Sequence, residues 1–562
     1  MNQSKDLENK TPPTSARNTG GKKSQFMLNE NDLQLMDLTG VATKEQRLRR
    51  QKSGLSRKEF LYAVNQDDII FAIPFGVFQI KIAFTMFLYY TSSSFLTYNM
   101  AFFLIEPDIY QCVFSVDPYK NTYPCTREYI CNNDIRSYID SWEANENADT
   151  RLYNWVDTLD LHCLTNYHIG LFGVALCAGM TLSSLCIPLL VQKYGRKMFT
   201  YLGAFLQILC YLVITISTNY HLYPAVLFAF GITIPFKNFI TYPHLMEFVP
   251  RQQIFVGGLM RCIDGLVFSI SPLILHFVTH NTKNLLYIAT CLNIISIVAL
   301  LILYVPESIK FNLSKGKYEE VIRDISFICI QDHVTNSKKE AMLKLIKTYQ
   351  YQQESRNNYS ALHFVFSEDQ YFYGDKEKEK QLFNKLNVIN LLLMMTCWIA
   401  TKFTFFTMIF YVKYLPGDLF SNATLGGASA FIFLFQSPIL QKLCPKRTQQ
   451  CSFAFNVLCL ISMFLMTHHF VDQHFMVYAV VFMCLRAGMY LSFSTIYTQH
   501  QDLFDQDFLG PSFAICTFVS RLFAVSGPMI AEVSDRKVPI LLMILLNSIA
   551  FICTSLLVVR NK

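Results

Sequence analysis

Four basic side chains stand inside long apolar stretches of this 562-residue sequence: Lys237, Lys402, Arg486 and Arg521. An ionised group in the interior of a lipid bilayer costs at least about 2.5 to 3.5 kcal/mol, so it normally faces a cavity or a partner. Lys and Arg outnumber Asp and Glu in these stretches. We therefore expect an electropositive cavity that prefers anions or zwitterions.

Arginine is well suited to binding carboxylates, because its guanidinium stays charged and forms two parallel hydrogen bonds with a carboxylate. Arg521 is the strongest candidate for such a role. Lys237 and Lys402 have an alternative interpretation, as side chains that are paired or that extend toward the membrane surface. Arg261 and Asp264 are one helical step apart, which predicts a structural ion pair between them.

The sequence contains no motif typical of an enzyme or a pump. We find no Gly-rich phosphate-binding loop and no H-E-x-x-H or paired C-x-x-C spacing. We therefore expect no catalytic residue, no metal site and no cofactor. The formal net charge of +7 lies in a few loops rather than on one basic face, so we expect no nucleic-acid partner.

Composition and hydropathy predict an all-α membrane protein. Apolar residues make up 52% of the chain and charged residues 16%, against roughly 25% charged residues in soluble domains. A membrane-spanning helix needs about 20 mainly apolar residues. Twelve stretches qualify, six before a long polar segment and six after it. They lie near 78–104, 167–191, 198–218, 222–248, 254–280, 285–305, 387–411, 424–440, 452–471, 475–498, 509–532 and 537–559.

Charge in the connecting segments predicts the orientation, because Lys and Arg are retained on the cytoplasmic side. Residues 1–66 hold twelve Lys or Arg and residues 306–385 hold thirteen, whereas residues 106–166 hold four against eleven acidic residues. We therefore expect cytoplasmic or matrix-facing termini and an outer segment at 106–166.

These boundaries divide the chain into four parts. They are a polar tail at 1–66, a six-helix bundle at 67–305, a central loop at 306–386 and a second bundle at 387–562. The tail is expected to be disordered unless a protein partner holds it.

Two short basic loops suggest an internal repeat. Residues 191–197 read V-Q-K-Y-G-R-K and residues 440–447 read L-Q-K-L-C-P-K-R, with starts 249 residues apart. Each loop follows the second span of its half. Such recurrence is typical of transporters built from two structural repeats.

The first loop is similar to the helix 2–3 loop of the major facilitator superfamily, G-x-x-x-D-R-x-G-R-[RK]. Gly195, Arg196 and Lys197 match, whereas Gln192 and Lys193 replace the Asp and the first Arg. The P-E-S-I-K-F…S-K-G-K-Y-E-E-V segment after span six is similar to P-E-S-P-R-W-L-x-S-x-G-[RK]-x-x-E-A of sugar and organic ion transporters. The sequence L-D-L-H-C that closes the long outer segment resembles W-D-L-x-C of organic ion transporters alone. The chain is identified as a divergent member of that family, which includes organic cation, carnitine and organic anion transporters.

The resemblance implies ligands for a substrate. Arg521, seven residues before Pro528, is similar to the helix 11 arginine of carnitine and anion transporters and would receive a carboxylate. Arg486 resembles a helix 10 position that adds positive potential. Trp398 and Phe405 stand where helix 7 aromatic side chains line the pocket, and their rings could pack an apolar body or a quaternary amine.

The resemblance also implies a gate, formed by residues whose match to the family motifs is partial. Neutral Gln192 would weaken the latch on the cytoplasmic side, and Gln441 occupies the same place in the second repeat. The candidate gating residues are Gln192, Lys193, Gly195, Arg196, Lys197, Glu247, Glu307 and Asp502.

Four cysteines lie in the outer segment, namely Cys112, Cys125, Cys131 and Cys163. Four cysteines allow three pairings, and the sequence does not choose among them. Disulfides are expected if this side of the membrane is oxidising, and free thiols if the membrane is organellar.

Two functions fit these observations. The first is a secondary transporter or facilitator of small organic anions or zwitterions, such as carnitine-like molecules, in a plasma or organellar membrane. The alternative is a transport-inactive structural subunit of a larger membrane complex, such as a respiratory assembly of the mitochondrial inner membrane. The eroded latch supports this alternative.

Overall fold

The computed structural model describes residues 64–558 except for 108, 116–118, 145–150, 367–384, 436–443, 470–474 and 505. Most of the tail expected at 1–66 and Gln441 therefore lie outside the described residues. Within them, ten helices are long and apolar enough to cross a membrane. Helix α4 (Val77–Thr97) and the shorter apolar helix Leu419–Phe435 occupy the places of spans one and eight. The twelve-helix prediction is confirmed.

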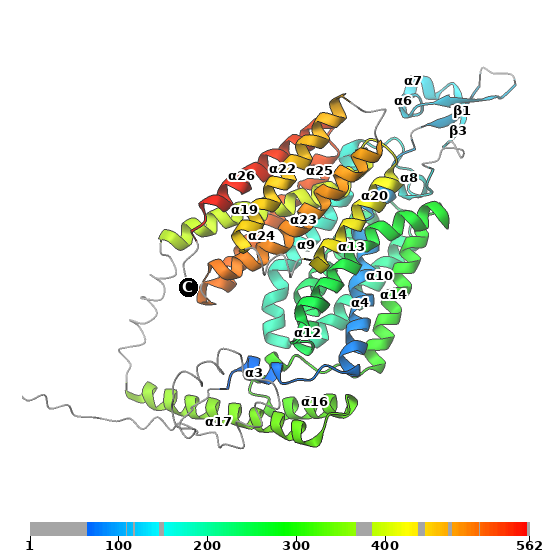
Figure 1. Ribbon diagram of the computed structural model, residues 1–562. Helices are drawn as coiled ribbons and strands as arrows, with labels where there is room; N and C mark the ends of the chain where they lie inside the picture. The colour runs from blue at the N-terminus through cyan, green and yellow to red at the C-terminus, as the bar shows by residue number, and fades with distance from the viewer. Residues whose placement is uncertain are drawn as a thin grey trace, which may run out of the picture. The chain divides into compact units, whose positions relative to one another are not determined.

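The N-terminal half contains the first six spans (Figure 1). They are α4, α9 (Asn166–Tyr194), α10 (Lys197–Ile216), α11 with η1 and α12 (Leu222–Phe236, Lys237–Thr241, Tyr242–Phe248), α13 (Gln253–Phe277) and α14 (Lys283–Ile302). Helices α9 and α11 approach closely because Gly179 lies against the backbone of Phe228 and Gly231 against the backbone of Leu176. Small residues are the usual means of close helix packing in membranes.

The C-terminal half contains the other six spans. They are α19 with η2 (Lys385–Tyr411, Val412–Tyr414), α20 with η3 (Leu419–Ala428, Ser429–Phe431), α22 (Pro445–His469), α23 (Phe475–Leu503), α24 with α25 (Gln506–Ala524, Gly527–Ala531) and α26 (Lys537–Leu556). Span eight begins five residues before the predicted 424, because Asp418 caps the helix by accepting hydrogen bonds from the backbone of Phe420 and Ser421.

The two halves meet in a reciprocal pattern. Helix α9, the second span of its half, packs against α24 and α25, which form the fifth span of the other half. Helix α13, the fifth span, packs against α20, the second span of the C-terminal half. Equivalent helices exchanging contacts in this way are what a two-fold relation between structural repeats produces.

The outer segment contains a small antiparallel sheet in the order β2-β1-β3. The strands are β1 (Tyr110–Phe114), β2 (Thr122–Cys125) and β3 (Ile139–Ala144). The short helices α6 (Arg127–Cys131) and α7 (Asn133–Arg136) lie between β2 and β3, and α8 (Trp155–Thr158) follows β3. Figure 1 places this sheet beyond one end of the bundle. We call that end the outer end and the opposite end the inner end.

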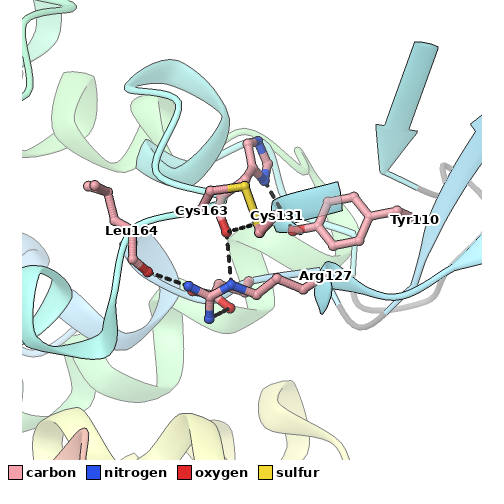
Figure 2. The surroundings of a disulfide bond; sticks show 7 residues. Tyr110, Arg127, Cys131, Cys163 and Leu164 are labelled. Atoms are coloured by element: carbon pink, nitrogen blue, oxygen red, sulfur yellow. Dashed lines mark hydrogen bonds and ion pairs between the residues drawn. A yellow bond between two sulfur atoms is a disulfide. The ribbon is translucent and has the colours of Figure 1, made fainter. Parts of the chain in front are cut away.

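Two disulfides stabilise the outer segment. They join Cys112 to Cys125 and Cys131 to Cys163. Beside the second one, the Arg127 Nε donates to the His162 carbonyl at 2.8 Å, and another nitrogen of the same guanidinium donates to the Leu164 carbonyl (Figure 2). These bonds tie the segment to the chain that leads into α9.

Five further helices complete the described chain. Helices α15 (Ile309–Ser314) and α16 (Tyr318–Gln331) follow span six, and the short helix α5 (Met100–Phe103) follows α4. Helices α3 (Gln66–Phe71) and α17 (Asn336–Phe366) contribute to a separate compact unit, in which Gln66 donates to the hydroxyl of Tyr349 at 3.0 Å. The central loop is therefore largely helical where it is described.

Candidate functional site

A cavity of about 820 Å³ lies between the two halves. Its lining comes from α4, α9, α11–α13, α19, α23 and α24, and its inner limit includes Gln253 and Ile254 in the first turn of α13. At its outer limit, the lining side chains are Tyr98 and Tyr490. Of the residues predicted to bind substrate, the structure places Lys237, Lys402, Phe405 and Arg521 in the wall.

Three cations in this wall have no carboxylate within ion-pair distance in the described part of the chain. Arg521 Nη1 donates to the Met180 carbonyl at 3.3 Å, and its Nε is buried without a partner. Lys402 Nζ lies 3.7 Å from the centroid of a phenylalanine ring, Phe493. Among the described residues, Arg261 donates to two hydroxyl groups, those of Ser494 and Tyr242. The wall therefore carries positive charge that no carboxylate among the described residues neutralises.

The hydroxyl of Tyr497 marks the point where these cations converge. Lys402 Nζ donates to it at 3.3 Å. Arg261, from the N-terminal half, donates to Ser494, one turn before Tyr497 on α23, and Arg521, from the C-terminal half, lines the same cavity. A bound anion at this point would contact groups from both halves, which is the arrangement that couples substrate binding to movement of one half against the other.

Asp264 pairs with Lys237 rather than with Arg261, so the prediction of an Arg261–Asp264 pair is wrong. The Lys237 Nζ lies 3.1 Å from Asp264 Oδ1. Asp264 also accepts hydrogen bonds from Ser94 and, at 2.8 Å, from Tyr98 on α4. Arg261 instead donates to hydroxyl groups at 3.0 Å, those of Ser494 and Tyr242. Sequence spacing missed Arg261 as a cavity residue because adjacency along a helix does not say which neighbours the helix meets.

A short π-helix positions Lys237. Pro235 near the end of α11 has no backbone N–H, and the next residues, Lys237–Thr241, form the π-helix η1. Such bulges inside longer helices are frequent at functional sites. Lys237 thereby reaches across to α4, where its Nζ also donates to the Tyr90 carbonyl at 3.1 Å and the Ser94 hydroxyl at 3.0 Å.

The two predicted aromatic ligands separate in the structure. Phe405 lines the cavity, and its ring lies 5.4 Å from that of Phe493. Trp398, seven residues or about two turns earlier on α19, is fully buried and does not line the cavity. Its ring packs edge-on against Tyr497 at 4.8 Å and Phe513 at 5.3 Å. Trp398 thus supports the cavity wall from behind, because Tyr497 and Phe513, which line the cavity, lie against its ring.

Arg486 also lies outside the cavity. Its side chain is 1% exposed, and its Nη2 donates to the hydroxyl of Tyr490 at 2.6 Å. Tyr490 lines the cavity and Arg486 does not. The prediction that Arg486 faces the cavity is therefore not met in this structure, because Arg486 lies one helical turn closer to the outer end than Tyr490.

Five predicted gating residues meet at the inner end of the N-terminal half. They are Gly195, Arg196, Lys197, Glu247 and Glu307. The backbone turns between α9 and α10 at Gly195, whose φ of +93° favours glycine. This turn directs the next two backbone N–H groups, of Arg196 at 2.8 Å and Lys197 at 3.1 Å, onto Glu307.

The side chains of this inner cluster are also joined. The guanidinium of Arg196 is paired with Glu247 at the end of α12. Ser308 donates to the same carboxylate at 2.5 Å. None of these residues belongs to the C-terminal half, so the cluster holds α9, α10 and α12 of the N-terminal bundle together with α15 of the central loop.

The other predicted gating residues lie apart from this cluster. Gln192 and Lys193 are exposed in the last turn of α9, and the Lys193 ammonium lies 5.1 Å from the centroid of the Tyr194 ring. Asp502 is exposed near the end of α23.

The outer end is closed by contacts that sequence patterns did not reveal. Lys413 Nζ lies 2.8 Å from Glu532 and donates to the Leu104 carbonyl of the other half at 3.2 Å. Between α9 and α25, a Cβ at Gly173 would lie 2.5 Å from the Cβ of Pro528. The cavity is thus closed at its outer end, and its lining extends to the inner end.

Comparison with known proteins agrees with this architecture. Residues 82–528 match the family model described as Major Facilitator Superfamily. The chain is similar to an inward-open structure of the xylose transporter XylE from E. coli, with a TM-score of 0.56 at 11% sequence identity, covering 88% of this chain and 97% of that chain. A partially occluded inward-open structure of the same transporter gives a TM-score of 0.52 at 11% identity, covering 86% and 98%.

No curated protein matches the sequence. At 11% identity, the two transporter structures support the fold alone. The family model, in contrast, spans well over half of the chain. The chain is an integral, multi-pass membrane protein that belongs to the major facilitator superfamily.

Proposed function

We propose that this chain is a secondary transporter of small organic anions that works by alternating access, with Arg521 as its principal substrate ligand. Membership of the major facilitator superfamily supports secondary transport by alternating access. The observation that carries the substrate class is the charge of the cavity wall. Among the described residues that line the cavity, four are Lys or Arg and one, Asp264, is a carboxylate.

Interactions already formed within the cavity wall favour an anion over a zwitterion as the substrate. A carnitine-like molecule needs a carboxylate or an aromatic face beside its quaternary ammonium. Asp264, the carboxylate of the cavity wall, is already paired with Lys237. The aromatic face of Phe493 is likewise covered by Lys402 at 3.7 Å. A carboxylate, in contrast, would meet the unpaired donors of Arg521 and the ammonium of Lys402. The position of Arg521, seven residues before Pro528, also supports the organic ion transporter family as the subfamily.

The domain boundaries and orientation belong to the same proposal. The halves 67–305 and 387–562 would rock about the cavity, with the termini and residues 306–386 on the cytoplasmic or matrix side. Positive charge in these connections supports this orientation. The membrane is a plasma or organellar membrane, and the two outer disulfides favour one whose outer face is oxidising.

Uptake into proteoliposomes tests the proposal. The purified chain is reconstituted, and uptake of radiolabelled succinate, benzoate and carnitine is compared with that of empty vesicles. Arg521→Ala should raise the KM for the carboxylates at least about tenfold, because charge-assisted hydrogen bonds contribute about 1.5 to 3 kcal/mol each. Arg521→Lys keeps the charge but loses the two parallel hydrogen bonds of the guanidinium. Its KM for the carboxylates should lie between that of the native protein and that of Arg521→Ala. Unchanged carboxylate uptake in Arg521→Ala would remove this residue from the mechanism.

A transport-inactive structural subunit was the alternative. Neither the family match nor the similar structures support it. It would gain support if no carboxylate, amine or zwitterion entered vesicles that contain folded protein.

A further inference from the structure

Arg486 is a buried cation whose hydrogen bonding is incomplete. Its side chain is 1% exposed, and its Nε and Nη1 have no hydrogen-bond partner. No carboxylate pairs with it in the part of the chain that the structure describes. Leaving a buried donor unsatisfied costs about 1 to 3 kcal/mol, more for charged groups, so such a side chain in a native structure needs an explanation.

The group that covers Arg486 comes from the other half of the protein. The guanidinium carbon lies 4.2 Å from the centroid of the Phe268 ring on α13, which belongs to the N-terminal half. The rings of Tyr490 and Phe482, at 5.2 Å and 6.0 Å, are on its own helix α23. Gly426 of α20 leaves room for the Phe482 ring beside Arg486, because a Cβ there would lie 2.5 Å from Phe482 Cε1. Arg486 therefore lies at the interface between the halves.

This interface is on the outer side of the cavity. The cavity-lining residues of α13 end at Gly265, and Phe268 lies one turn closer to the outer end. On α23, which runs in the opposite sense, the lining begins at Tyr490, one turn beyond Arg486. Next to Phe268, the Ser269 hydroxyl donates to the Thr424 carbonyl of α20 at 2.5 Å. Arg486 thus lies just beyond the outer limit of the cavity, under contacts that join the two halves.

Alternating access requires these contacts to separate. When one half rocks against the other, the outer ends part and the inner ends close. Phe268 then moves away with α13, whereas Phe482 and Tyr490 stay with Arg486 on α23. The ring that compensates the charge is lost, and the unpaired Nε and Nη1 become accessible from the outer vestibule. A guanidinium with free donors at the edge of such a vestibule is suited to bind a carboxylate through two parallel hydrogen bonds.

We propose that Arg486 is the carboxylate-binding site of the outward-facing state, sealed by Phe268 when the outer end closes. A substrate anion entering from the outer side binds Arg486 first and passes to Arg521, Lys402 and Arg261 as Phe268 returns to the guanidinium. This inference rests on the proposed transport of organic anions, and it adds a second site that operates in one state only. When the outer end closes, the Phe268 ring takes the place of the anion beside the Arg486 guanidinium. The site can therefore close without a bound substrate.

A labelling experiment tests the accessibility of position 486 without any substrate. In right-side-out and inside-out vesicles, Arg486→Cys is treated with a membrane-impermeant methanethiosulfonate, and modification of the peptide that contains position 486 is read by mass spectrometry. We expect modification from the outer side at least tenfold faster than from the inner side. Addition of Phe268→Ala should accelerate it further, whereas Phe482→Ala, which removes a ring on the same helix as Arg486, should not. Equal modification from both sides, or none from the outer side, would overturn the proposal.

Side-specific transport kinetics provide the second test. With labelled succinate as the probe, Arg486→Gln should raise the KM measured from the outer side about tenfold or more and leave the KM from the inner side within about twofold. Arg486→Lys should restore part of the outer affinity. Equal changes on both sides, or no change on either, would refute a state-specific site. If the native protein takes up no carboxylate at all, the proposed function fails, and the labelling experiment still decides whether position 486 is exposed in one state only.

Discussion

The buried pair between Lys237 and Asp264 allows a quantitative prediction. Both side chains are almost fully buried, with 6% and 7% exposed, and the atoms Lys237 Nζ and Asp264 Oδ1 are 3.1 Å apart. Two single substitutions remove one charge each, Lys237→Met and Asp264→Asn. The double variant removes both charges at once, so the three variants together with the native protein form a double-mutant cycle.

The magnitude follows from the state of the remaining partner. A single substitution leaves an uncompensated charge in a buried site, which costs about 3 to 5 kcal/mol, whereas replacing both members of a buried pair is often neutral. In Lys237→Met, Asp264 keeps the hydroxyl donors of Ser94 and Tyr98, which places the cost toward the lower end of that range. We expect each single variant to lose about 3 kcal/mol of unfolding free energy and the double variant less than about 1.5 kcal/mol.

Equilibrium unfolding in mixed detergent micelles measures the cycle, with far-UV circular dichroism as the signal. Lys402→Met is the matched control, because Lys402 is equally buried but has no carboxylate partner in the described part of the chain. Its removal relieves an uncompensated charge, so we expect unchanged or increased stability. Additive effects of the two single substitutions, or a loss of stability in Lys402→Met as large as that in Lys237→Met, would refute the reasoning.

Three further predictions concern the outer contact, the outer segment and the inner cluster. Gly173→Val places side-chain atoms against Pro528, so the outer end cannot close and succinate uptake should fall at least about tenfold while the protein still folds. Burial lowers the pKa of His162 below its ordinary 6.5, so the unfolded chain binds the proton at a higher pH than the folded chain does. The outer segment should therefore lose stability as the pH falls below 6.5. Hydrogen exchange of residues 110–144 measures this loss. Glu247→Gln keeps hydrogen-bonding atoms but removes the charge opposite the partly exposed Arg196, which should cost about 1 to 2 kcal/mol of unfolding free energy in the same micelle assay.

Each of these predictions has a control. Gly170→Ala places its Cβ against the flexible sulfur of Met529 and should transport normally, and equal loss in both variants would contradict a specific role for Gly173. Burial raises the pKa of Glu106 above 4.5, so this carboxyl stabilises the folded protein as the pH falls, whereas His162 destabilises it. The contribution of His162 is therefore read as the difference in pH dependence between the native protein and His162→Gln. Half-buried His168 provides the control substitution, and a pH dependence that survives in His162→Gln would contradict the assignment. For Glu247→Gln, an unchanged free energy of unfolding would show that the Arg196–Glu247 ion pair does not contribute to stability.

Patterns along the chain were sufficient for the architecture because hydropathy reports the depth of a residue in the membrane. The observed helices lie close to the twelve predicted stretches, and the loop repeat anticipated the reciprocal packing of α9 with α24–α25 and of α13 with α20. Gly195, Glu247 and Glu307 belong to separate sequence motifs. In the structure, Glu247 and Glu307 both accept hydrogen bonds from Arg196, the residue after Gly195 in the turn between α9 and α10. The sequence could not predict this meeting, because each motif residue comes from a different connection.

The amino-acid sequence alone was enough to place cationic groups at membrane depth in a protein of two similar halves, because length, apolar composition and spacing are properties of the chain in one dimension. Their partners depend on how each helix is rotated and on which helix faces it. Rotation and packing paired Lys237 with Asp264, turned Arg261 and Arg521 toward one cavity, and placed Arg486 behind Tyr490 under Phe268. Whether a buried charge is paired, free to bind a ligand or sealed under a ring is therefore a property of the packed bundle, since residues three apart on a helix can face different neighbours.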